Sequence, residues 1–166
     1  MNLNTQRWFV LLLTICLVGI GCVNAPTEPV QDTKAPSVPT NVLKRLDLSN
    51  QGLTQVSQDV FKKTYLTELD LSNNKLTGAL PGEIRQLSNL IKLDVSDNQM
   101  TGVPAEVGQL QNLRELDLSN NQFTGLPLEL GNLSSLELLD LRGNVYSTQD
   151  LEKIKASLAN TEILTD

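Results

Sequence analysis

The sequence has no histidine, only two cysteines and few aromatic residues, and each shortage narrows the functions that fit it. Both cysteines, Cys16 and Cys22, lie near the N-terminus, so residues 23–166 hold no thiol for a disulfide, a metal site or nucleophilic catalysis. Without histidine, cysteine or a glycine-rich phosphate loop, the sequence shows no assembled catalytic site. We therefore expect a protein that is not an enzyme and that needs no cofactor and no metal.

Positive charge is also scarce. The chain has 13 Lys and Arg against 19 Asp and Glu, a formal net charge of -6. Removing Arg7 with an N-terminal signal would leave 12 basic residues against 19 acidic ones, a balance of -7. Because nucleic-acid phosphates attract the opposite sign, we expect no nucleic-acid partner.

No apolar run is long enough to cross a bilayer of about 30 Å, but a shorter one stands near the N-terminus. Trp8 to Ile20 follows Arg7, a pattern typical of an export signal. The following Gly21-Cys22 resembles the lipobox of bacterial lipoproteins, in which the cysteine is acylated and becomes the first mature residue. This resemblance predicts a signal peptide at 1–21 and lipid attachment at Cys22. The alternative is ordinary cleavage after Ala25, which the proline at the next position disfavours.

Residues 22–42 would then carry the lipid and link it to the folded part. Four prolines lie there among polar residues, a composition that predicts a disordered, extended tether. Several acyl chains on Cys22 would anchor the protein stably. We expect localisation in a bacterial cell envelope, outside the cytoplasm, on the outer membrane if the cell has one.

The rest of the chain repeats one unit, Leu-x-x-Leu-x-Leu-x-x-Asn-x-Leu. Successive units begin 23, 24, 23 and 23 residues apart, at Leu43, Leu66, Leu90, Leu113 and Leu136. The Leu-x-Leu alternation in each unit has the period of a strand with one apolar face. One such strand cannot bury its leucines alone, so the units are expected to stack into a parallel sheet over a shared core.

Two further positions recur with the same period. The amides of Asn74, Asn98, Asn121 and Asn144 follow each strand and are suited to bond backbone groups that have no strand partner, whereas the first unit has Gln51 there. Pro81, Pro104 and Pro127 are predicted to be the first residues of short helical turns on the outer face, with glycine turns before them. A helix over about 148–159, capped by Ser147 or Thr148, is expected to cover the last unit.

These repeats, covering Leu43 to Leu164, resemble the leucine-rich repeat family. The resemblance implies an α/β solenoid at 43–166: a right-handed coil of about five repeats with a parallel concave sheet. Short helical or 3-10 turns would form its convex side, with the C-terminal helix as a cap. The N-terminal end has no comparable cap and is expected to be partly exposed.

Polar strand positions should form columns across the concave face. The first column, Arg45, Glu68, Lys92, Glu115 and Leu138, alternates in sign and is predicted to form a ladder of ion pairs. The second is five aspartates, and the third is four serines followed by Arg142. The aspartates are either a cation site or ordinary repeat consensus, and the second interpretation is favoured because a flat column supplies few converging oxygens. The predicted partner-binding residues are Arg45, Asp47, Glu68, Asp70, Lys92, Asp94, Glu115, Asp117 and Arg142.

The resemblance implies a membrane-anchored, extracytoplasmic module that binds a protein or peptide. Five strands cover a projected area of about 300 Å², enough for a peptide or loop, so a larger partner would also need the loop edge at Lys75, Gln99, Gln122 and Val145. One alternative is a structural or adhesive envelope protein that self-associates through its N-terminal end. A second is an intracellular signalling scaffold of the same family.

Overall fold

The computed structural model describes residues 44–166, and all structural statements below concern that part. The predicted signal peptide at 1–21, the lipidated Cys22, the tether up to residue 42 and Leu43 lie outside the described residues.

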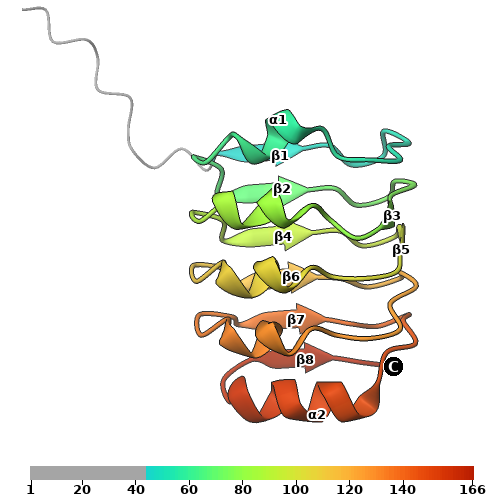
Figure 1. The fold of residues 1–166 in the computed structure, drawn as a ribbon, viewed down its shortest axis with the longest axis vertical. Coiled ribbons are helices and arrows are strands. Elements are labelled where there is room, and N and C mark those ends of the chain that lie inside the picture. Colours follow the sequence, from blue (N-terminus) through green and yellow to red (C-terminus); the bar gives the residue numbers. More distant parts are fainter. Residues whose placement is uncertain (1–43) are drawn as a thin grey trace, which may run out of the picture. The chain divides into compact units, whose positions relative to one another are not determined.

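One layer of the fold is a six-stranded parallel sheet in the order β1-β2-β4-β6-β7-β8 (Figure 1). Its register aligns the central apolar residue of every strand, for example Leu69 with Leu93 and Leu93 with Leu116. A separate two-stranded sheet pairs β3 with β5. The strands are β1 (Arg45–Asp47), β2 (Glu68–Asp70), β3 (Thr77–Gly78), β4 (Lys92–Asp94), β5 (Gln99–Met100), β6 (Glu115–Asp117), β7 (Leu138–Asp140) and β8 (Glu162–Leu164).

The other layer consists of short helices that return the chain to the next strand. They are α1 (Gln58–Phe61), the 3-10 helices η1 (Gly82–Gln86), η2 (Ala105–Gln109) and η3 (Leu128–Asn132), and α2 (Thr148–Ser157). The predicted prolines stand one residue earlier than expected, at the N-cap and not the first helical position. At that place Pro81 supplies the carbonyl that accepts the first helical bond, from the N–H of Ile84 at 3.1 Å.

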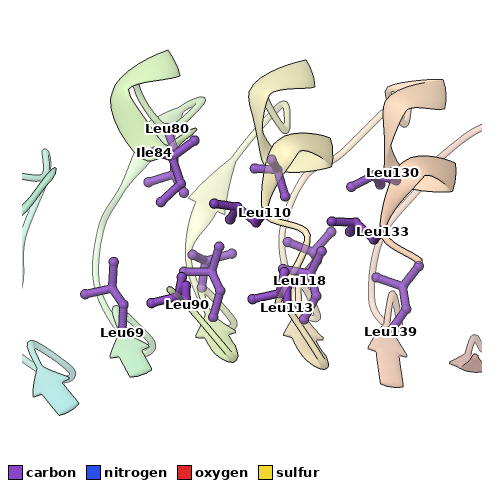
Figure 2. Close-up of a cluster of buried hydrophobic side chains, with 14 of the residues drawn as sticks. Leu69, Leu80, Ile84, Leu90, Leu110, Leu113, Leu118, Leu130, Leu133 and Leu139 are labelled. Atoms are coloured by element: carbon purple, nitrogen blue, oxygen red, sulfur yellow. The ribbon is translucent and has the colours of Figure 1, made fainter. Parts of the chain in front are cut away.

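Leucines fill the space between the two layers (Figure 2). Strand residues such as Leu69 and Leu139 meet outer residues such as Ile84 and Leu130, and all four are buried. Fully burying one such side chain stabilises the fold by about 1.5 to 3 kcal/mol. The core is therefore one continuous column that spans the repeats, as the sequence predicts.

The asparagine positions form the predicted ladder. Asn98 is buried, and its Nδ2 donates to the carbonyls of Leu71 and Ser96 at 3.0 Å and of Val95 at 3.1 Å. Its Oδ1 accepts from the N–H of Leu76 at 3.0 Å. Each amide thus ties its own repeat to the preceding one.

The first repeat departs from this ladder. Gln51 is exposed, and its backbone N–H donates to Oδ1 of Asn74 at 3.0 Å. The same Oδ1 accepts from the N–H of Leu53. The first turn is therefore served by the asparagine of the second repeat, and no long amide is needed in the first.

The two ends of the sheet differ. At the first, Leu46 and Leu48 are only half-buried, in agreement with the expected partial exposure. At the last, Ser147 caps α2 as predicted, but α2 packs beside η3 in the helical layer. For the larger sheet, the prediction of five strands is wrong by one, because the chain after α2 adds β8 in parallel to β7. The last sheet edge is therefore β8, not a helix.

Candidate functional site

The face of the sheet away from the core, called here the open face, carries the predicted columns. Strand pairing places Arg45 beside Glu68, Glu68 beside Lys92, and Lys92 beside Glu115. Six predicted partner-binding residues line one hollow of about 310 Å³ with Leu69: Arg45, Glu68, Asp70, Lys92, Asp94 and Glu115. Asp47, Asp117 and Arg142 do not line it.

The charges in this hollow pair only partly as predicted. Lys92 Nζ lies 2.7 Å from Glu115 Oε2 along the first column, and this bond is the main cause that raises the pKa of Lys92. Arg45 instead turns to the aspartate column, where its Nη2 lies 3.0 Å from Asp70 Oδ2. The predicted ladder is thus wrong at its first two steps, where Glu68 forms no ion pair with Arg45 or Lys92. The long guanidinium of Arg45 reaches Asp70, two residues further along β2, as easily as Glu68 directly beside it.

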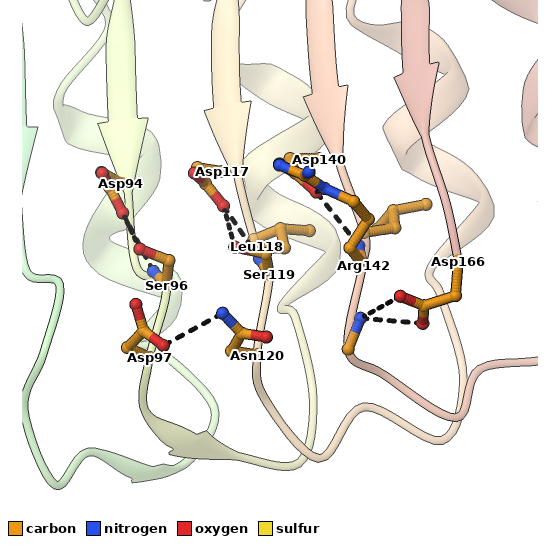
Figure 3. Close-up of polar contacts among 12 residues, drawn as sticks. Asp94, Ser96, Asp97, Asp117, Leu118, Ser119, Asn120, Asp140, Arg142 and Asp166 are labelled. Carbon is orange, nitrogen blue, oxygen red and sulfur yellow. Dashed lines mark hydrogen bonds and ion pairs between the residues drawn. The ribbon is translucent and has the colours of Figure 1, made fainter.

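The aspartates are held by the residues that follow each strand (Figure 3). Oδ1 of Asp94 accepts from the hydroxyl of Ser96 at 2.6 Å and from its N–H at 3.0 Å. The same pair of bonds recurs at Asp47, Asp70 and Asp117. One oxygen of each of these carboxylates therefore closes the turn at the end of its strand.

This arrangement corrects the expectation that the serines of the third column lie exposed on the open face. The hydroxyls of Ser72, Ser96 and Ser119 donate to the aspartates, and all three residues are buried. They are not part of an exposed binding surface. Arg142, which stands in the same column, is exposed and bonds Asp140.

The different surroundings of Asp117 and Asp140 shift the pKa values of these two aspartates in opposite directions. Burial is the main cause that raises the pKa of Asp117, with repulsion from Asp94 and Asp140 adding to it. Hydrogen bonding from Arg142 is the main cause that lowers the pKa of Asp140. A column of like carboxylates is therefore tolerated through local hydrogen-bond donors and two guanidinium groups, those of Arg45 and Arg142.

Within residues 44–166, no group of three or more Asp, Glu, His or Cys side chains is arranged to hold a metal ion. None of the helices described is both long enough and apolar enough to span a membrane.

The comparisons with known proteins agree with this geometry. A family model described as "Leucine rich repeat" matches residues 41–100 and 88–145. The chain belongs to the leucine-rich repeat family. As a leucine-rich repeat protein it has the solenoid architecture of a fold that typically serves as a non-enzymatic binding scaffold.

Individual relatives match part of the chain. A solved leucine-rich repeat protein of Leptospira interrogans is 41% identical, with a TM-score of 0.69, covering 73% of this chain and 31% of that one. The ectodomain of the Arabidopsis thaliana receptor kinase GASSHO1/SCHENGEN3, in complex with CASPARIAN STRIP INTEGRITY FACTOR 2, is 34% identical, with a TM-score of 0.62. It covers 74% of this chain and 15% of that one.

Among curated relatives, the CCR4-Not complex 3'-5'-exoribonuclease subunit Ccr4 of Schizosaccharomyces pombe is 53% identical over 51 residues. That match spans 31% of this leucine-rich repeat protein and 7% of the relative. The aligned part is thus a small fraction of the enzyme.

The structure also shows a surface that the sequence columns do not include. A second hollow of about 530 Å³ lies where the strands begin, on the opposite side from the predicted loop edge. We call it the N-edge hollow; its lining residues are Lys44, Tyr65, Thr67, Asn89, Ile91, Asn112 and Arg114. The sequence offers one signal for this hollow, which is the position of four lining residues within the repeat. Two residues before the central strand leucine stand Lys44, Thr67, Ile91 and Arg114.

Proposed function

We propose that this protein is a binding module that recognises a protein or peptide through the open face. The observation that carries the proposal is the hollow, in which four charged side chains take no part in closing the strand-end turns: Arg45, Glu68, Lys92 and Glu115. Lys92 and Glu115 are about half exposed, at 48% and 47%, and Arg45 at 52%. Such charges contribute little to stability, yet complementary charges on a partner would set its specificity and register.

The mixed signs indicate the kind of ligand. Arg45 and Lys92 lie among four carboxylates, so a polar segment with both signs fits better than a uniformly acidic one. The complex of the related receptor kinase ectodomain supports recognition of a macromolecule by this fold. Catalysis forms no part of the proposal.

A charge swap tests the role of the open face. Peptides selected from a random library on the wild-type chain would be assayed against the double variant Lys92→Glu and Glu115→Lys, which retains an ion pair but inverts its direction. We expect selected peptides to lose at least 10-fold in affinity. The control Arg85→Glu, on the exposed side of η1, should bind as the wild type does. Equal binding by the swap variant, or a loss confined to the control, would contradict the proposal.

We also propose that a lipid on Cys22 holds the module outside the cytoplasm. The support is the sequence pattern Gly21-Cys22 after the apolar run. Labelling cells with a radioactive fatty acid should mark the wild-type chain and leave a Cys22→Ser variant unmarked. Labelling of neither chain would favour the intracellular scaffold or ordinary signal cleavage.

Self-association is the second candidate function. It is supported by the half-buried Leu46 and Leu48 at the first sheet edge. Sedimentation equilibrium should then show dimers whose population falls when Leu46 is replaced by serine. A monomer at high micromolar concentration would exclude this candidate.

A further inference from the structure

The N-edge hollow combines exposed apolar side chains with positive charge. Tyr65 is 50% exposed and Ile91 36%, and together they are two of the four large apolar side chains exposed within residues 44–166. Both line this hollow, which lies on the side from which the strand arrows start in Figure 1. Exposed apolar surface gathered in a hollow is a feature of binding sites, whereas scattered exposure is not.

Backbone hydrogen bonds fix the order of the residues along this edge. The carbonyl of Lys44 accepts from the N–H of Thr67 at 3.1 Å, and that of Thr67 accepts from Ile91 at 2.7 Å. The carbonyl of Ile91 in turn accepts from Arg114 at 2.8 Å. With neighbouring strands about 4.8 Å apart, this row spans about 14 Å from Lys44 to Arg114. A cation therefore stands at each end, with an apolar side chain between them.

Both cations are positioned to meet a ligand. Lys44 Nζ lies 5.2 Å from the centroid of the Tyr65 ring, a cation–π distance that keeps the ammonium at the hollow. Arg114 Nη1 lies 3.2 Å from Glu137 Oε1, and its side chain is 60% exposed. A single contact of this kind occupies one of the five N–H donors of a guanidinium. No carboxylate lines the hollow, although the chain as a whole is acidic.

Two side-chain amides complete the lining. Nδ2 of Asn89 donates to the carbonyl of Thr64 at 2.8 Å, and Nδ2 of Asn112 donates to that of Ser88 at 2.8 Å. These bonds fix the amide groups and leave each Oδ1 as an acceptor for a backbone N–H of a ligand. The hollow thus presents acceptors for an extended main chain between its two cations.

We propose that the N-edge hollow binds an extended acidic segment of a partner protein. Because an extended chain advances about 3.3 Å per residue, 14 Å separates carboxylates about four positions apart. The segment would therefore present acidic residues at positions i and i+4 with an apolar side chain at i+2 against Ile91 and Tyr65. This inference rests on the proposed function and makes it more specific. A partner bound to the open face would place an acidic segment of its own in the N-edge hollow.

Short synthetic peptides test the proposal on the full chain. The probe Ac-Ser-Glu-Gly-Leu-Gly-Glu-Ser-NH2 should bind saturably and shift the amide NMR signals of Thr67, Ile91 and Arg114. Replacing both glutamates by lysine, or the leucine by serine, should weaken binding at least 10-fold. Lys44→Glu combined with Arg114→Glu should do the same, whereas Glu137→Gln should strengthen binding about 2- to 3-fold by releasing Arg114. The control Arg85→Glu, a charge reversal outside the hollow lining, should change nothing.

Several results would overturn the proposal. One is the absence of saturable binding at millimolar peptide, and another is equal binding of the serine-substituted probe. Loss of binding in the open-face swap with no loss in the Lys44 and Arg114 variant would place the acidic peptide on the open face, which leaves the proposed function intact. A dimer of the free chain that the Lys44 and Arg114 substitutions dissolve would make a second copy the occupant instead.

Discussion

Asp117 and Asp140 occupy the same position on neighbouring strands, yet their pKa values move in opposite directions. We expect Asp140→Asn to lower the free energy of unfolding by about 1 to 2 kcal/mol at neutral pH, because it removes a charge-assisted bond to Arg142. The matched Asp117→Asn should be neutral or stabilising by up to about 1 kcal/mol. Its amide oxygen can still accept from Ser119, while a carboxylate charge disfavoured by burial is lost.

The pH dependence of the pair follows from these directions. A raised folded pKa gives Asp117 a contribution that is present below its unfolded pKa of about 3.9 and is lost as pH rises through the folded value. The lowered pKa of Asp140 gives the reverse, a contribution present above about 3.9 and lost as pH falls through the folded value. Urea unfolding at neutral pH and near pH 3 should show the two variants converging in acid. Equal destabilisation by both at neutral pH would contradict this account.

The asparagine ladder makes a second prediction for single residues. Asn98→Leu keeps the branched shape and the number of side-chain heavy atoms but leaves three carbonyls and the N–H of Leu76 without their amide partner. We expect a loss of about 3 kcal/mol in the free energy of unfolding, measured by urea titration. Gln51→Leu, at the same repeat position but exposed, should change it by less than about 0.5 kcal/mol. Similar losses at both positions would mean that the ladder bonds do not set the stability.

At the scale of the elements, the close packing of neighbouring 3-10 helices such as η2 and η3 contributes to the stability of the fold. A Cβ atom added to Gly108 of η2 would press on the carbonyl of Glu129 in η3, 2.7 Å from its carbon. We expect Gly108→Ala to cost about 1 to 3 kcal/mol and to lower the thermal midpoint, because backbone cannot move aside as a side chain can. Gly125→Ala meets nothing within 4 Å and serves as the control. An unchanged midpoint for Gly108→Ala would show that η2 and η3 separate freely.

Elements with a regular repeat could be predicted from the sequence, and those without one could not. Five strands and three outer turns follow from leucine, asparagine and proline at fixed spacing. The sixth strand was missed because only Ile163 keeps a repeat leucine position, while Asn160 and Thr165 stand where Leu136 and Leu141 would recur. Strand pairing with β7, which the sequence does not encode as a pattern, holds β8 in place.

The site was predictable to the same extent. Columns across the sheet follow from register, so six of the nine candidate residues do gather in one hollow. The direction taken by Arg45 and the burial of the serines depend on side-chain rotamers and local turns, which strand alternation does not specify. The N-edge hollow was missed because its row has four unlike residues, from Lys44 to Arg114, and so shows no repeat.

Across residues 44–166, one set of residues stabilises the fold and a different set lies exposed on the open face. Buried leucines, the asparagine ladder and the aspartate–serine bonds hold neighbouring repeats together. The charges of the first column lie on the open face, where ion pairs between exposed groups contribute about 0 to 1 kcal/mol each. We therefore expect these charges to be available for a partner, because their ion pairs contribute little to the stability of the fold.

The most direct test is the free energy of unfolding of one quadruple variant. Replacing Arg45, Glu68, Lys92 and Glu115 together by glutamine keeps their polarity and removes their charge. Urea unfolding at neutral pH should give a value within about 1 kcal/mol of the wild type, with the same dependence on urea concentration. A loss of about 3 kcal/mol or more would show that the open-face charges hold the sheet together, and would contradict the account.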